Sequence, residues 1–181
     1  MWHALLSDTR FFDLLYRFDQ DLAEQTQVKG CPCGGRLDRA NYPRKPRGGP
    51  ADLSPDQERR ESFCCHRDGC RSRTTPPSLR FLGRRVYFGV AVILMTAMTH
   101  GASPRRVTAL RAELGVDRRT LARWQQWWRE DFPTSRFWRE HRARLSPALS
   151  AEGFPGTLLD RFAPQREPHE IVSLLRFLAP I

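Results

Sequence analysis

The stretch VTALRAELGVDRRTLARWQQWW, residues 107–128, predicts two short helices joined by a tight turn. Apolar residues recur at helical spacing on both sides of Gly115, namely Val107, Leu110 and Leu114, then Val116, Leu121 and Trp124. Gly115 readily adopts the positive φ that ends a helix, and Asp117 can cap the helix that follows. A helix pair of this kind fits the major groove of DNA.

The second predicted helix has an outer face rich in arginine. If the apolar stripe points inward, the residues left on or beside the outer face are Arg118, Arg119, Thr120, Ala122, Arg123 and Gln126. Such side chains bind phosphates and base edges, so the candidate DNA contacts are Arg118, Arg119, Thr120, Arg123 and Gln126. The alternative is an ordinary amphipathic helix pair whose arginine face is solvated. The turn chemistry and the clustering of arginine favour DNA binding.

The chain of 181 residues has a formal net charge of +10, concentrated in its middle. Residues 29–129 hold 21 Lys and Arg against 8 Asp and Glu, whereas the two flanks together hold 9 against 12. Such a field attracts polyanions, so nucleic acid is the expected partner. Further candidate DNA contacts outside the second helix are Arg44, Lys45, Arg47, Arg84, Arg85, Arg105 and Arg106. For the basic Pro/Gly loop over residues 42–52, a solvated hairpin tip is the alternative.

Five cysteines lie in two groups, CPCGG at residues 31–35 and CCHRDGC at residues 64–70. A tetrahedral zinc ion takes four soft ligands, and a small module with little core gains folding energy from that closure. Adjacent Cys64 and Cys65 would point to opposite faces of a strand, so we expect only one of them to bind. The predicted zinc ligands are Cys31, Cys33, Cys65 and Cys70, with Cys64 and His66 as alternates. The C-x-C and C-x4-C spacings depart from the usual C-x2-C, and they exclude neither zinc nor a rubredoxin-like iron centre.

Changes in composition divide the chain into four regions. The expected regions are an N-terminal amphipathic helix (1–28), a zinc-ribbon-like module (29–78), a helix-turn-helix domain (79–131), and a basic helix with a Pro-rich C-terminal tail and a terminal helix (132–181). The expected fold is therefore mostly α with a small Cys-rich β module. Helices are expected near 82–99, 104–114, 117–130 and 169–178.

Several classes of protein are not supported by the sequence. The longest apolar run, residues 86–99, is shorter than the roughly 20 residues that span a bilayer, so no membrane partner is expected. No secretory signal is visible, and a cytoplasmic, reducing location follows, in which cysteines serve as metal ligands. Nucleotide-binding and hydrolase motifs are missing, and Asp160, Glu167 and Glu170 are scattered in Pro-rich chain. We therefore expect no enzyme activity.

The chain contains three segments in a characteristic order, which are RRESFCCHRDGCRSRTTPPS, LRFLGRRVYFGVAV and the helix pair. In this order of parts the chain resembles the zinc-ribbon plus helix-turn-helix proteins associated with bacterial insertion-sequence transposases. The resemblance covers about residues 30–130. It implies binding of transposon-end or other target DNA, ribbon ligands at Cys31, Cys33, Cys65 and Cys70, and a recognition helix with Arg118, Arg119, Thr120 and Arg123. The roughly 50 residues after the helix pair leave no room for the catalytic domain of a full transposase.

The sequence thus predicts a cytoplasmic, zinc-stabilised DNA-binding protein of the transposase-associated type, without a catalytic domain of its own. Its expected partner is double-stranded DNA, and a transposase catalytic subunit or a second copy of the chain are further candidates. A second hypothesis is a protein-interaction adaptor that binds its partner through the aromatic N-terminal helix and Trp127, Trp128 and Trp138. A third hypothesis is a redox module with iron at the cysteines.

Overall fold

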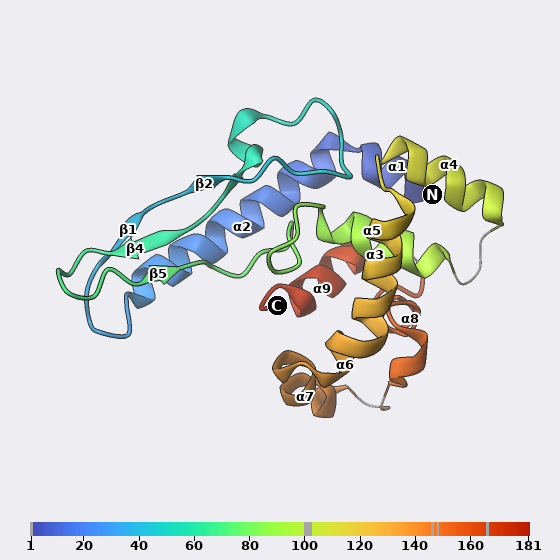
Figure 1. Cartoon of the computed structure of the whole chain (residues 1–181). Coiled ribbons are helices and arrows are strands. Elements are labelled where there is room, and N and C mark those ends of the chain that lie inside the picture. The colour runs from blue at the N-terminus through green and yellow to red at the C-terminus, as the bar shows by residue number, and fades with distance from the viewer. Residues whose placement is uncertain (1, 100–102, 146, 148, 166) are drawn as a thin grey trace.

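The computed structural model describes residues 2–99, 103–145, 147, 149–165 and 167–181, without the side chains of Trp2, His3 and Arg106. The protein is mostly helical, with a small antiparallel sheet at one end (Figure 1). The helices are α1 (Trp2–Ser7), α2 (Thr9–Lys29), α3 (Gly89–Met98), α4 (Pro104–Glu113), α5 (Arg118–Gln126), α6 (Phe132–Thr134), α7 (Arg136–His141), α8 (Gly156–Phe162) and α9 (Pro168–Leu178). The strands are β1 (Leu37–Arg39), β2 (Tyr42–Pro43), β3 (Arg59–Arg60), β4 (Phe63–Cys65) and β5 (Arg73–Thr74).

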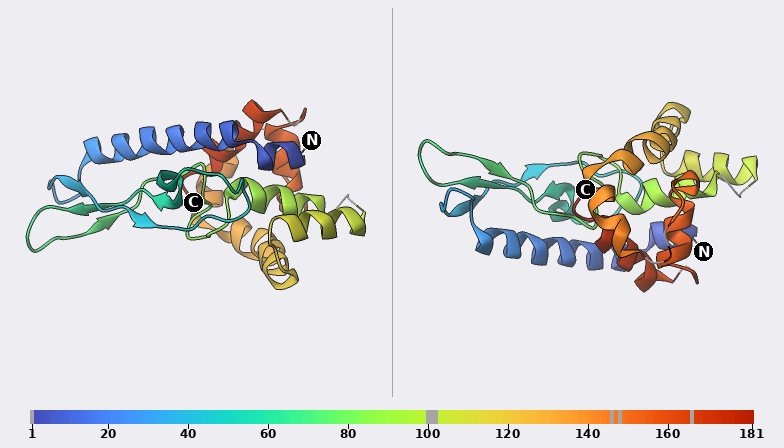
Figure 2. Two further views of the ribbon diagram at one scale, coloured as in Figure 1. Left: turned by 90° about the horizontal axis from the view of Figure 1, so that it is seen from above. Right: turned by 90° about the horizontal axis from the view of Figure 1, so that it is seen from below.

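The molecule is elongated, and α2 runs along it. Views from above and below show the sheet and the helix pair α4–α5 at opposite ends (Figure 2). Asp8 caps α2, because its Oδ1 accepts a hydrogen bond from the Arg10 amide at 3.0 Å, and α2 ends at Gly30, which has a φ of 72°. The N-terminal helical region expected from the sequence is therefore two helices, since the cap at Asp8 separates α1 from α2.

The sheet belongs to the cysteine module, by which we mean residues 30–77. β4 lies between β1 and β5, with Leu37 opposite Cys65 and Phe63 opposite Thr74, while β2 and β3 form a separate antiparallel pair. The core of this module is small and consists of Ala23 from α2, Cys31, Leu37, Phe63 and Cys65. A core of this size gives little stability by itself.

A buried ion pair ties α2 to the chain that follows the module. Arg80 Nε donates to Asp19 Oδ2 at 2.8 Å, and both side chains are fully buried. Asp19 also accepts hydrogen bonds from the Ser78 hydroxyl and the Leu79 amide, each at 2.6 Å. The other Arg80 nitrogens donate to the carbonyl oxygens of Gln57 and Arg59. Because both charges are hydrogen-bonded, the pair fixes one arrangement of these segments.

The helical body, residues 79–181, packs around the apolar helix α3, which is buried from Gly89 to Thr96. It joins α2 through aromatic contacts, including that of Phe12 with Phe88 at 4.7 Å between ring centroids. A second aromatic cluster in the body contains Trp128, Phe132, Trp138 and Phe154. Within the described ranges, no helix combines the length and apolar character needed to cross a membrane.

Two helix boundaries differ from those expected. α3 begins at Gly89 rather than near residue 82, because the preceding chain makes isolated bridges between Arg47 and Tyr87 and between Phe81 and Phe88. α5 ends at Gln126 and continues as a π-helical turn over Trp127–Asp131, where the helix of residues 117–130 was expected to run on. The extra residue in the π turn changes the direction of the side chains that follow it.

The C-terminal region packs into the main core instead of forming a tail. α9 is close to the expected terminal helix, and it buries Ile171, Val172, Leu174, Leu175 and Leu178. α8 was not expected, because Pro155 and Pro164 bracket it closely and leave too short a stretch for a visible helical period. Its Leu158 and Leu159 are nevertheless buried in the same cluster.

Candidate metal centre and nucleic-acid interface

Four cysteine side chains converge beside the C-terminal end of α2. Cys31 Sγ lies 3.8 Å from Cys70 Sγ, and Cys33 Sγ lies 3.5 Å from Cys65 Sγ. All four sulfur atoms lie within 4.8 Å of one another. A tetrahedral site with Zn–S bonds of about 2.3 Å has sulfur–sulfur distances of about 3.8 Å. The four predicted ligands therefore have the spacing of a site that could hold a metal ion.

The turn between Cys31 and Gly35 holds two of these sulfur atoms. The Gly34 amide donates to the Cys31 carbonyl at 2.8 Å, and the Cys31 amide donates to the Gly35 carbonyl at 2.9 Å. A Cβ atom on Gly35 would lie 2.6 Å from Cys65 Sγ and 3.4 Å from Cys33 Sγ. Glycine at position 35 thus allows the backbone to approach the sulfur atoms closely, which fits a metal cradle.

The surroundings shift the pKa values of the two clustered cysteines in the second group in opposite directions. The Arg67 amide hydrogen-bonds the Cys65 sulfur, but burial and the other three thiols raise the pKa of Cys65 to about 12. Hydrogen bonds from the Ser72 hydroxyl and amide lower the pKa of Cys70 to about 6. Four adjacent thiols do not all ionise without a compensating cation, and a bound metal dication supplies that charge.

The alternates Cys64 and His66 lie outside this cluster. Cys64 is paired with Asp38 in the β1–β4 register, and its Sγ lies 3.5 Å from the Arg71 carbonyl oxygen. His66 is exposed, and its Nδ1 lies 2.8 Å from Asp38 Oδ2. This contact lowers the pKa of Asp38. Alternation along β4 explains why Cys65 joins the cluster and Cys64 does not.

The helices α4 and α5 are joined by a tight turn at Gly115. Gly115 has a φ of 61°, and its carbonyl accepts a hydrogen bond from the Tyr87 hydroxyl at 2.8 Å. Asp117 caps α5, since its Oδ1 accepts from the Thr120 amide at 2.7 Å, and the hydrogen bonds from Thr120 lower the pKa of Asp117. The apolar stripe faces inward as expected and comprises Val116, Leu121 and Trp124.

The outward face of α5 carries four of the five DNA contacts that the sequence predicted in this helix. The exposed residues are Arg118, Arg119, Arg123 and Gln126. Thr120 differs, because it is only 7% exposed. Its hydroxyl donates to Asp117 Oδ2 at 3.0 Å and accepts from Arg123 Nη2 at 3.0 Å. Thr120 therefore completes the cap and orients Arg123 instead of facing outward.

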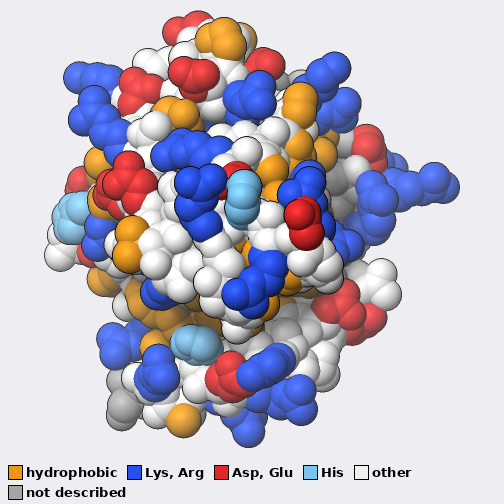
Figure 3. Space-filling model, turned by 90° about the vertical axis from the view of Figure 1, so that its left-hand side faces the viewer, with side chains coloured by type: hydrophobic (Ala, Val, Ile, Leu, Met, Phe, Trp, Pro, Cys, Tyr) orange, Lys and Arg blue, Asp and Glu red, His pale blue; other side chains and the backbone are white. Residues whose placement is uncertain are grey.

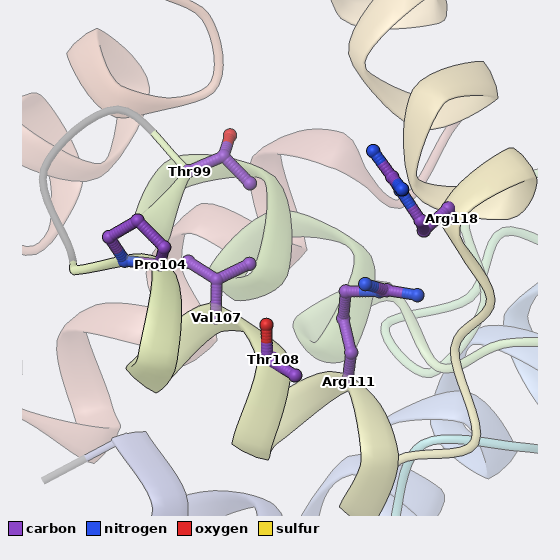
Figure 4. A pocket seen from close by; sticks show the side chains of 6 residues that line it. All are labelled: Thr99, Pro104, Val107, Thr108, Arg111 and Arg118. Carbon is purple, nitrogen blue, oxygen red and sulfur yellow. The ribbon is translucent and has the colours of Figure 1, made fainter.

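An open pocket of about 380 Å³ lies between α4 and the start of α5. Its lining residues are Thr99, Pro104, Val107, Thr108, Arg111 and Arg118. In Figure 4 the side chains of Arg111 and Arg118 come from two different helices and lie on two sides of this open space. Arg111 Nε also donates to the Val116 carbonyl at 3.2 Å, which holds this side chain across the turn. Two guanidinium groups that line one pocket suit an anion such as phosphate.

Arg111 is a site residue that sequence reasoning missed. Its position in the first helix indicated only an ordinary polar residue beside the apolar stripe. The turn at Gly115 folds α4 back toward α5 and so brings Arg111 near Arg118. Arg111 and Arg118 are seven residues apart, on either side of the turn at Gly115. This spacing is the sequence signal that could have placed them at one pocket.

The basic loop at residues 42–52 packs on the helical body close to α5. The Arg47 amide donates to the Val86 carbonyl, and the Phe88 amide donates to the Arg47 carbonyl. Tyr87, between these two residues, packs on Trp124 of α5 at 4.9 Å between ring centroids. Predicted contacts outside α5 that are exposed are Lys45, Arg47, Arg84 and Arg105. The side chain of the predicted contact Arg106 lies outside the described residues.

Two further predicted contacts, Arg44 and Arg85, have their guanidinium groups engaged within the protein. Arg44 Nη2 donates to the Arg85 carbonyl at 2.8 Å. The Arg85 guanidinium lies 3.9 Å from the centroid of the Trp127 ring, and burial lowers the pKa of Arg85. Both side chains stabilise the folded structure, so they are weaker candidates for phosphate contacts than their exposed neighbours.

The aromatic residues of the adaptor hypothesis lie mainly inside the molecule. Trp128 is fully buried, Trp138 is 4% exposed, and Trp127 is half-buried beneath Arg85. In the aromatic N-terminal helix, Phe11 and Phe12 are buried in the core and Phe18 is half-buried. The buried residues of this set stabilise the fold.

Comparison with known proteins leaves the function open. No family model matches the chain, and no curated protein or solved structure is significantly similar to it. The functional assignment therefore depends on the geometry of the cysteine cluster and on the exposed face of α5.

Proposed function

We propose that the protein binds double-stranded DNA through α5 and that zinc held by the four cysteines stabilises the cysteine module. The observation that carries this proposal is the face of α5 on which Arg118, Arg119 and Arg123 are exposed opposite a buried apolar stripe. An α-helix fits the major groove, and a guanidinium group can hydrogen-bond both O6 and N7 of guanine. Arg119 and Arg123 are the proposed base contacts.

The surroundings of α5 support contacts with the DNA backbone. Exposed basic residues lie at the start of α4 and on the two segments that pack beneath α5, and these are Arg105, Lys45, Arg47 and Arg84. The pocket that Arg111 and Arg118 share offers a place for one phosphate group. Phosphate contacts supply affinity for DNA of any sequence, while contacts with base edges supply preference for one sequence.

The proposed ion is zinc, which has no redox chemistry and binds tetrahedrally to four thiolates. Iron fits the same four sulfur atoms, and it is the ion that the redox hypothesis requires. Metal analysis of protein purified without chelator distinguishes the two ions. We expect about one zinc per chain and a colourless protein, whereas a red protein containing iron would favour the redox hypothesis.

The proposed biological role is that of a DNA-binding component associated with a transposase, without catalytic activity of its own. The resemblance of residues 30–130 to insertion-sequence proteins supports a specific DNA site such as a transposon end. A separate transposase subunit, or a second copy of this chain, would then be the protein partner. The adaptor alternative has less support because Trp128 and Trp138 are buried.

Selection of bound duplexes from a random pool tests the proposal. We expect the zinc-loaded protein to enrich a defined sequence. Arg119→Ala should relax that preference, with a loss of about 1–3 kcal/mol on the preferred duplex. Arg139→Ala removes one exposed arginine from α7 and should leave the preference unchanged. Failure to enrich any sequence, together with equal behaviour of the two variants, would count against base recognition by α5.

A further inference from the structure

The turn between β4 and β5, taken together with the first residue of β5, carries exposed arginines that the proposed function does not use. Arg67, Arg71 and Arg73 are all exposed, close to the cysteine cluster and at the opposite end of the molecule from α5. The two segments that hold the cysteines, residues 29–39 and 64–73, contain six basic residues against two acidic ones. Figure 3 faces this end of the molecule and shows Lys and Arg side chains spread over it among several Asp and Glu side chains.

The positive charge at this end exceeds what the metal centre needs. Four thiolates around a divalent ion carry a net charge of −2. Arg39 pairs with Glu61, which lies outside the two segments, so the excess that remains is three positive charges. Neutralising the cluster leaves one positive charge over. The arginines are therefore not explained by the charge of the cluster alone.

Two of the three arginines have no structural task within the fold. Arg67 is different, because its Nη1 donates to the Cys33 carbonyl at 2.7 Å. Within the described parts of the chain, the side chains of Arg71 and Arg73 make no hydrogen bond or ion pair. Arg71 also has a φ of 47°, a conformation that glycine or asparagine adopts with less strain, so the turn itself does not require arginine there.

α2 holds this basic end at a fixed distance from the helical body. Phe12 packs on Phe88 near the start of α2, and Asp19 pairs with Arg80 in its middle. Near its C-terminal end, Gln27 Nε2 donates to the Leu37 carbonyl at 3.0 Å. These three attachments hold α2 against the helical body, the chain that follows the module and the module itself. From residue 12 to residue 29 the helix rises about 25 Å.

We propose that the turn bearing Arg67, Arg71 and Arg73 is a second contact with the DNA backbone, which α2 holds about one duplex turn from the site of α5. This inference rests on the proposed function. α2 alone spans about 25 Å between residues 12 and 29, and α5 lies on the helical body, away from the end of α2 that carries the cysteine module (Figure 1). One turn of duplex is about 34–36 Å long, or about 10 base pairs, and the two contacts would then be one such turn apart. Both contacts then face one side of the same duplex.

Hydroxyl-radical footprinting of the zinc-loaded protein on its preferred duplex tests this arrangement. We expect two protected segments about 10 base pairs apart. The double variant Arg71→Asn/Arg73→Gln leaves Arg67 in place and should lose one segment while keeping the other. Its salt slope should also become shallower by about two units, one for each arginine that no longer pairs with a phosphate.

Arg139→Gln/Arg142→Gln is the matched control, because it removes the same charge from exposed positions on and just after α7. The control should keep both segments, and zinc content verifies that the metal centre of each variant is intact. A single protected segment in the wild type, or two segments in the Arg71/Arg73 variant, would overturn the second contact while leaving α5 as the binding helix. Protection of no segment by the wild type would overturn the proposed function and this inference together.

Discussion

The cysteine module and the helical body differ in what holds them together. The module has a core of five residues, two of which are proposed metal ligands. The helical body belongs to a much larger core, which also includes Leu5 in α1 and extends through α3 to Ala179 beyond α9. A small core requires a cross-link, whereas a large one is stabilised by apolar burial. One chain therefore joins two ends that should respond differently to loss of metal and loss of packing.

Removal of the metal should have the largest effect and should be confined to the module. Structural zinc contributes an apparent free energy of about 10–16 kcal/mol in small domains, and the core of this module cannot replace it. Chelation, or Cys65→Ser, should therefore abolish amide-exchange protection in β1 and β4. Protection in α3 and α9 should remain. Hydrogen exchange with and without chelator checks this.

Cys64→Ser provides the control for the cysteine assignment. Cys64 Sγ lies outside the four-sulfur cluster, so this variant should retain its metal while Cys65→Ser loses it. The reverse order of metal loss would show that Cys64 is the ligand. Unchanged protection of β1 and β4 after chelation would remove the contrast between the module and the body.

Breaking the ion pair that joins the two regions should have the next largest effect. Asp19→Ala leaves the fully buried guanidinium of Arg80 without its carboxylate, at a cost of about 3–5 kcal/mol of unfolding free energy. Asp21→Ala, at an exposed position of the same helix, should change the stability by less than about 0.5 kcal/mol. Urea denaturation measures both, and similar stabilities would show that the pair does not couple the ends.

Gly35→Ala should act on the metal centre alone. The added Cβ would lie 2.6 Å from Cys65 Sγ, so the sulfur atom or the turn must move. We expect metal affinity to fall by at least about tenfold, comparable to the loss of an outer-shell partner. Gly156→Ala, where a Cβ meets nothing within 4 Å, is the control. Competition with a chelating dye gives both affinities, and equal values would argue against close approach at Gly35.

The cap of α5 should give the smallest effect, and it should depend on pH. Hydrogen bonds from Thr120 lower the pKa of Asp117 from its ordinary value of 3.8. Its ionisation therefore stabilises the folded protein above that value, and this contribution is lost as pH falls through the lower folded pKa. Asp117→Asn retains a capping oxygen without ionising. The stability difference between wild type and variant should shrink on acidification, and a difference that is constant down to about pH 2 would contradict the assignment.

Much of the local structure of both ends could be predicted from the sequence. The spacing around Gly115 predicted two helices and a turn, because the apolar period, the glycine and the cap all lie within one short stretch. Strand alternation at Cys64 and Cys65 selected the correct four clustered thiols, because the period of two separates adjacent side chains.

Contacts between distant segments were not predictable in the same way. The pairing of Asp19 with Arg80 joins positions 61 residues apart, and neither residue carries a local signal of its partner. α8 is too short and too closely bracketed by proline to show a period. Thr120 was placed outward because its polarity suits DNA, but its cap hydrogen bonds bury it. Local periodicity predicts which face of a helix is buried and where the turns lie. Tertiary packing decides which polar side chains are buried and hydrogen-bonded within the fold.

The claim that α5 binds duplex DNA is tested most directly by measuring the affinity of the zinc-loaded protein for its preferred duplex at several salt concentrations. We predict that the logarithm of the affinity falls linearly with the logarithm of the salt concentration, because phosphate contacts release counterions. Arg118→Ala should make that slope shallower by about one unit, since Arg118 lines the proposed phosphate pocket with Arg111. Binding that does not depend on salt, or no binding at low salt, would contradict the account.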